Sequence, residues 1–80
     1  MDTLEKIHAT INDIAQEPGV NISKIDDYKF KVVIMGNLMT AFEKLGEVEK
    51  KIQESCNGEY DLRTVCGDGQ DATLILTKVE

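Results

Sequence analysis

Tryptophan is absent from this sequence of 80 residues, and the aromatic side chains are limited to two tyrosines and two phenylalanines. Basic residues are also scarce, since nine of them stand against 15 acidic residues and leave a net charge of −6. Non-specific binding to nucleic acid or to an anionic membrane needs a cationic surface, so this charge argues against both kinds of partner. Charged residues make up 30% and apolar residues 41%, which indicates a folded domain rather than a disordered chain.

Long hydrophobic runs are missing as well. The longest are "VVIM" at 32–35 and "LIL" at 74–76, and both are far too short to cross a bilayer. The opening "MDTLEKIHAT" has neither the basic start nor the continuous apolar stretch of a signal peptide. We therefore expect a cytoplasmic protein that forms one α+β domain over residues 1–80.

Cysteine occurs only twice, at Cys56 and Cys66. The pattern places the first at a helix end and the second at the far end of the strand that follows, roughly 20 Å away. A disulfide needs Cα atoms within about 7 Å, so we expect no bridge between them. Two buried or half-buried thiols in a reducing compartment are the expected state.

Two amphipathic helices are predicted from spacings of three and four residues between apolar side chains. The first covers 3–16, where Asp2 and Glu5 resemble a capping box, and "EPG" at 17–19 ends it. The second covers 38–55 and ends at "CNGE". The expected buried stripes are Leu4, Ile7, Ile11 and Ile14 in the first helix, and Leu38, Phe42, Leu45, Val48 and Ile52 in the second.

Each helix is followed by a predicted β-hairpin, because apolar and polar residues alternate on both sides of a turn signal. In the first hairpin a three-residue loop at 25–27 would pair Ile22 with Phe30 and Val20 with Val32, leaving one apolar face. In the second, "GDGQD" forms a five-residue loop at 67–71. That loop would pair Leu62 with Leu76 and place Thr64 opposite the residue at 74.

The order αββαββ predicts a two-layer α+β sandwich, with both helices on one face of a four-stranded antiparallel sheet. This order is a circular permutation of the ferredoxin-like arrangement, and the comparison places the second strand of each hairpin at the centre of the sheet. These two strands, "KFKVVIM" and "ATLILTKV", are the most apolar, as central strands should be. The alternative omits a strand at 20–24 and leaves αβαββ with a three-stranded sheet.

No set of residues predicts a cofactor, a metal ion or a catalytic site. Gly36 before Asn37 follows a strand and precedes a helix, but the further glycines and the lysine of a phosphate-binding loop are missing. His8 is the only histidine, and its place beside an apolar stripe indicates a partly buried structural role. Asp68 and Asp71 lack the alternating ligands of a calcium loop. A small-ligand site near Gly36 or the second cysteine remains an alternative.

The sheet face away from the helices is the most informative surface. Its apolar centre is expected around Val33 and Ile75, and Lys29, Lys31 and Arg63 fringe it. An apolar centre with a charged fringe is typical of a protein contact, most simply a symmetric homodimer and otherwise another protein. The aromatic side chains on which RNA-binding sheets stack bases are absent from this face. The predicted interface residues are Lys31, Val33, Met35, Arg63, Val65 and Ile75.

A second hypothesis starts from the acidic surface. Small acidic proteins of phages and other mobile elements inhibit nucleic-acid enzymes by mimicking the charge of phosphates. The acidic residues that would act here are Glu43, Glu47, Glu54, Asp68 and Asp71, although no run reaches five like charges.

Overall fold

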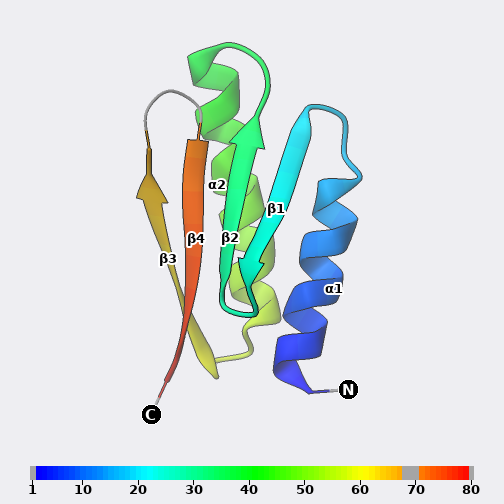
Figure 1. Cartoon of the computed structure of the whole chain (residues 1–80), viewed down its shortest axis with the longest axis vertical. Coiled ribbons are helices and arrows are strands. Elements are labelled where there is room, and N and C mark those ends of the chain that lie inside the picture. Colours follow the sequence, from blue (N-terminus) through cyan, green and yellow to red (C-terminus); the bar gives the residue numbers. More distant parts are fainter. Residues whose placement is uncertain (1, 68–70, 80) are drawn as a thin grey trace.

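A computed structural model describes residues 2–67 and 71–79 of the chain. The elements are α1 (Thr3–Ala15), β1 (Val20–Asp26), β2 (Lys29–Ile34), α2 (Leu38–Ser55), β3 (Tyr60–Cys66) and β4 (Asp71–Lys78). This αββαββ order confirms the predicted architecture and contradicts the alternative without a strand at 20–24 (Figure 1).

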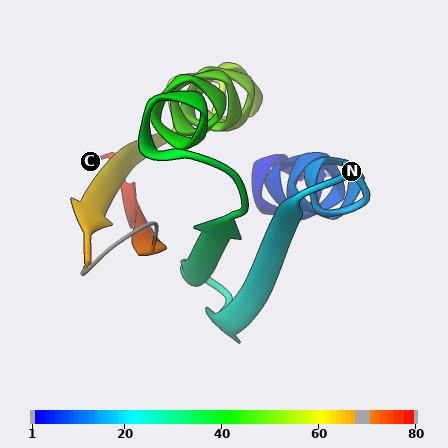
Figure 2. The ribbon, with the colours of Figure 1, turned by 90° about the horizontal axis from the view of Figure 1, so that it is seen from above.

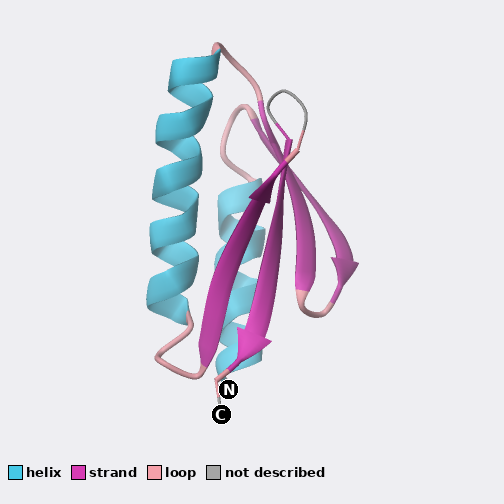
Figure 3. Cartoon of the chain, turned by 90° about the vertical axis from the view of Figure 1, so that its left-hand side faces the viewer, coloured by secondary structure: helices cyan, strands magenta, loops and turns pink. Residues whose placement is uncertain are grey.

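The four strands form one antiparallel sheet in the order β1-β2-β4-β3. The two central strands are therefore the second strands of the two hairpins, as predicted. Both helices cover the same face of this sheet, and no helix among the described residues covers the other face (Figures 2 and 3). None of the described helices is both long and apolar enough to span a membrane.

The register of the second hairpin is confirmed, because Leu62 pairs with Leu76 and Thr64 with Leu74. The loop residues 68–70, including the predicted site residue Asp68, lie outside the described part of the chain. In the first hairpin the predicted pairs are wrong by two residues, since Ile22 pairs with Val32. A shift of two residues leaves every side chain on its predicted face, because side chains alternate with a period of two.

The cause of this shift lies in the turn between β1 and β2. The Asp26 carboxylate accepts a hydrogen bond from the Tyr28 backbone N–H at 2.7 Å, which closes a tight turn over Asp27 and Tyr28. Asp26 then pairs with Lys29, and the ladder resumes at Lys24 after an irregularity. The loop thus has two residues plus a bulge, rather than the predicted three-residue loop.

Both helices begin at capping residues that the sequence identifies. The Asp2 side chain accepts from the Glu5 N–H at 2.8 Å, and the Asn37 side chain accepts from the Thr40 N–H at 2.9 Å. Gly36, just before the second cap, has a φ of +122°, a conformation that glycine adopts without the cost of a side chain. The stretch that could have been a phosphate loop is therefore a strand-to-helix turn.

The core lies between the helix pair and the sheet. Its buried side chains are Ile7, Ile11, Ile14, Val20, Phe30, Val32, Ile34, Ala41, Val48, Ile52, Cys56, Ala72, Leu74 and Leu76. The prediction is wrong at the start of α2, where Leu38 is 54% and Phe42 58% exposed. Ala41 is buried instead. One apolar stripe of α2 runs through Phe42 and another through Ala41, and both include the half-buried Leu45. In the structure the stripe through Ala41 is the one that faces the sheet.

Candidate functional site on the open sheet face

The open sheet face is organised by rows of residues that lie opposite one another on neighbouring strands. Ile75 on β4 pairs with Lys29 on β2 and with Arg63 on β3, so it lies between two cations. Neither Lys29 nor Arg63 forms an ion pair with any residue in the described part of the chain. With about 4.8 Å between strands, this row presents two free cations roughly 10 Å apart around an apolar centre.

The next row is mixed in character. Lys31 pairs with Ser23 on β1 and with Thr73 on β4, and Thr73 pairs in turn with Val65 on β3. Lys31 also forms an ion pair with Asp71, at 3.7 Å between Nζ and Oδ2. Val65 is 49% exposed and provides the apolar end of this row.

Val33 and Ile75 do not form the single apolar centre that the sequence suggested. Val33 pairs with Asp71, which is four residues from Ile75 along β4 and therefore roughly 13 Å away. The side chains of Val33 and Ile75 are both half-buried. Met35 lies beyond the end of β2, where its N–H donates to the carbonyl of Gly19, and its side chain is 60% exposed.

The predicted acidic set does not form one surface. Glu43, Glu47 and Glu54 are exposed on α2, in the helical layer. Asp71 lies on the opposite side of the molecule, where it faces Lys31. The structure thus divides the described acids of this hypothesis between two faces.

His8 and the cysteines occupy separate places. His8 Nε2 lies 3.0 Å from the carbonyl oxygen of Asp27, and its ring packs edge-on against Phe30 with 5.7 Å between centroids. His8 is thus partly buried, as predicted. Cys56 is buried at the end of α2, whereas Cys66 at the end of β3 is exposed, contrary to the prediction. Both thiols are free, and burial raises the pKa of Cys56.

A small apolar hollow lies beside Cys66, one of the two places where the sequence left a small-ligand site open as an alternative. The side chains of Leu38, Phe42 and Leu45 line it together with Cys66, and its volume is about 130 Å³. Sites for drug-sized ligands usually measure about 300–1,000 Å³, so this hollow is too small for a ligand of that size. The sequence pattern assigns Leu38 and Phe42 to the core, so it does not predict that these two side chains line the hollow.

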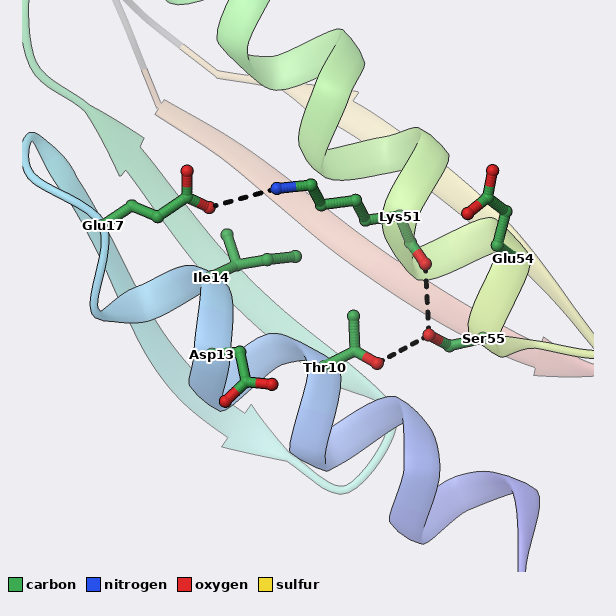
Figure 4. A pocket seen from close by; sticks show the side chains of 7 residues that line it. All are labelled: Thr10, Asp13, Ile14, Glu17, Lys51, Glu54 and Ser55. Carbon is green, nitrogen blue, oxygen red and sulfur yellow. Dashed lines mark hydrogen bonds and ion pairs between the residues drawn. The ribbon is translucent and has the colours of Figure 1, made fainter.

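A groove runs between the two helices, and most of the residues that line it are polar (Figure 4). Thr10 and Ser55 meet at one end, and Glu17 reaches Lys51 at the other, at 3.6 Å between Oε2 and Nζ. Glu17 also accepts a hydrogen bond from Lys44, and these contacts lower the pKa of Glu17 and raise that of Lys44. The Thr10–Ser55 and Glu17–Lys51 contacts thus join α2 to α1 and to the loop that follows α1.

Among the described residues, no three histidine, cysteine or acidic side chains lie close enough together to hold a metal ion. No protein-family model matches the chain, and no curated protein is significantly similar to it.

Proposed function

We propose that the chain is a non-catalytic protein-interaction module that acts in the cytoplasm and binds its partner through the open sheet face. One observation carries the proposal: Ile75 lies between Lys29 and Arg63, two cations without an ion pair in the described part of the chain. A cation left unpaired beside a half-buried apolar residue is available to a partner's carboxylate.

The arrangement of charges on this face, with cations around Ile75, favours a second protein over a second copy as the partner. In a symmetric face-to-face dimer, Lys29, Lys31 and Arg63 of both copies would enter one interface, where like charges repel. Asp26, Asp61 and Asp71 oppose them on the described part of the face, but at its margins, with Asp26 and Asp61 on the edge strands β1 and β3 and Asp71 at the start of β4. We therefore propose a partner with an apolar side chain for Ile75 and carboxylates on both sides of it.

Recovery of partners from extracts of the native host tests the proposal. The wild-type chain should enrich a protein with an acidic surface, and Ile75→Asp should lose it. The double variant Lys29→Glu/Arg63→Glu should lose it too, whereas Lys6→Glu/Lys78→Glu, with the same change in net charge away from the open sheet face, should retain it. Binding of the purified partner should weaken as salt is raised.

Two results would count against the proposal. Equal recovery by the Ile75 variant and the wild type would place the contact elsewhere, and no enrichment over a resin without the chain would leave this face without a partner. The acidic-inhibitor hypothesis predicts a different pattern in the same experiment, because Glu47→Lys/Glu54→Lys would then abolish recovery of a basic nucleic-acid enzyme while Ile75→Asp would not.

A further inference from the structure

The outer face of α2, which points away from the sheet, carries exposed apolar side chains. Met39 is 76% exposed, more than any other large apolar residue in the described part of the chain, and Phe42 is 58% exposed. Exposed clusters of this kind are typical of contact surfaces. The helix faces away from the open sheet face, so this feature is independent of the function proposed above (Figure 2).

Gly46 lies in the middle of the same face. It is an ordinary helical residue, and a Cβ added to it would meet no atom within 4 Å. Glycine destabilises a helix interior relative to alanine, so nothing within the described chain accounts for its presence. A shallow hollow lies beside it, lined by Gly46, Glu49, Lys50, Gln53 and Glu54. Residues spaced i, i+3, i+4 and i+7 on one helix form the hole that receives a side chain from a facing helix.

Glu43 and Lys50 lie three residues before and four residues after Gly46. Neither forms an ion pair with another described residue. At about 100° per residue the two side chains lie only about 20° apart, on one flank of the outer face. Phe42 and Gln53 lie about 20° apart on the other flank, where Glu49 also falls. Opposite charges thus stand almost symmetrically about Gly46.

We infer that this face binds a second copy of the chain, with the two α2 helices antiparallel and crossing at Gly46. A two-fold axis at that point brings each flank against its own counterpart. Glu43 then meets Lys50 of the partner subunit, and Lys50 meets Glu43 of the partner subunit, which makes two ion pairs. On the other flank, Phe42 enters the hollow beside Gly46 of the partner subunit. The two ion pairs and the insertion of Phe42 into the hollow therefore require the same antiparallel crossing of the helices.

Such a dimer leaves both open sheet faces uncovered and directed away from each other. One helix face is small compared with the roughly 800 Å² that each partner buries in a standard interface, so we expect weak, reversible association. A dimer of this form would also bind a partner with two sites more tightly than the monomer does.

Sedimentation equilibrium of the full chain between roughly 10 µM and 1 mM, at about 0.15 M salt, tests the inference. The wild type should show a reversible monomer–dimer equilibrium. Gly46→Gln should raise the dimer Kd by tenfold or more without lowering the thermal stability measured at low concentration. Lys29→Glu changes the net charge of the chain by the same amount as Lys50→Glu, but it lies on the sheet. It should therefore leave the dimer Kd close to that of the wild type.

Charge reversal tests the register independently. Glu43→Lys and Lys50→Glu should each weaken the dimer, and the double variant should restore it. An equimolar mixture of the two single variants should form heterodimers in preference to either homodimer. A monomer over the whole concentration range overturns the inference. It is overturned equally by a dimer that Gly46→Gln does not weaken, or by a double variant that associates no better than the single ones.

Discussion

The hydroxyl of Thr10 on α1 and that of Ser55 on α2 lie 2.6 Å apart and join the two helices by a hydrogen bond (Figure 4). Each hydroxyl is also within hydrogen-bond distance of a carbonyl oxygen one turn earlier in its own helix, that of Lys6 at 3.0 Å and that of Lys51 at 3.1 Å. Because each hydroxyl carries one proton, two donors serve three contacts. The pair is therefore a shared network rather than a set of independent bonds.

Removing either hydroxyl should destabilise the fold modestly. Thr10→Val and Ser55→Ala should each lower the free energy of unfolding by about 0.5–1.5 kcal/mol, the usual net value of a hydrogen bond. A double-mutant cycle measured by urea unfolding tests the coupling. The double variant should lose less free energy of unfolding than the sum of the losses in the two single variants. Thr77→Val, at an exposed position on β4, is the matched control and should have little effect. Strict additivity would show that the two hydroxyls do not interact.

The two thiols should differ sharply in reactivity. Cys66 is exposed, whereas Cys56 is 1% exposed and its burial raises the thiol pKa, so little thiolate is available there. With a disulfide reagent near pH 8, one thiol per chain should react at once and the second only as the protein opens. Cys66→Ser should remove the fast phase and leave the slow one. Two fast thiols in the folded protein would contradict the burial of Cys56.

The contribution of Glu17 to stability should depend on pH. The hydrogen bond from Lys44, the main cause, holds the pKa of Glu17 below its usual 4.5, so its contribution is present above that value and is lost as the pH falls through the lowered pKa. The raised pKa of Lys44 makes its own contribution complete below 10.5 and lost as the pH rises above that value. The pair therefore stabilises the fold between these limits.

Glu17→Gln should consequently unfold at a lower temperature than the wild type near pH 7, by a few degrees at most (about 1–4 °C), because the pair is partly solvent-exposed. The unfolding temperatures of the two proteins should converge as the pH is lowered through the acidic range. High salt should also reduce the difference between these temperatures. Glu59→Gln, an exposed acid without an ion pair in the described chain, is the control. A difference that persists unchanged at low pH would exclude the ion pair as its cause.

Two glycines should respond in opposite directions to alanine. At Gly36 the φ of +122° strains any side chain although space is available, so Gly36→Ala should destabilise the fold by about 1–3 kcal/mol. At Gly46 the backbone is helical and the space open, so Gly46→Ala should stabilise the monomer by about 0.5–1 kcal/mol. Thermal unfolding at low protein concentration measures both. A destabilised Gly46→Ala monomer would contradict the open space found there.

Sequence patterns predict which face of the sheet each side chain occupies better than they predict which residues lie next to one another across the strands. Alternation assigns Val32 to the core and Ile75 to the open face whichever register the strands adopt, because a shift of two residues preserves the face. The row Lys29–Ile75–Arg63 needs the pairing of three strands, and β2 and β4 are joined by no turn that would fix their register. Only the three-dimensional structure could show that Ile75 stands between two cations.

The helices show a similar limit. Asp2 and Asn37 are recognisable as caps from local sequence alone, since a cap bonds to a residue three positions ahead. The buried face of α2 is ambiguous, because Phe42 and Ala41 head two stripes that share Leu45. Size favours Phe42 for the core, but the helix places the smaller side chain against the sheet. The packing of α2 against the rest of the fold decides which stripe is buried, and the spacing of apolar residues in the sequence does not reveal that packing.

Ile52 and Phe42, both expected in the buried stripe of α2, should therefore behave differently. Ile52 is completely buried, so Ile52→Ala should remove about 2–5 kcal/mol from the free energy of unfolding by leaving a cavity. Phe42 is 58% exposed, and Phe42→Ala should cost less than about 1 kcal/mol in the monomer. Urea unfolding of both variants at low protein concentration makes the comparison. A Phe42 variant as unstable as the Ile52 variant would mean that the stripe through Phe42 faces the core after all.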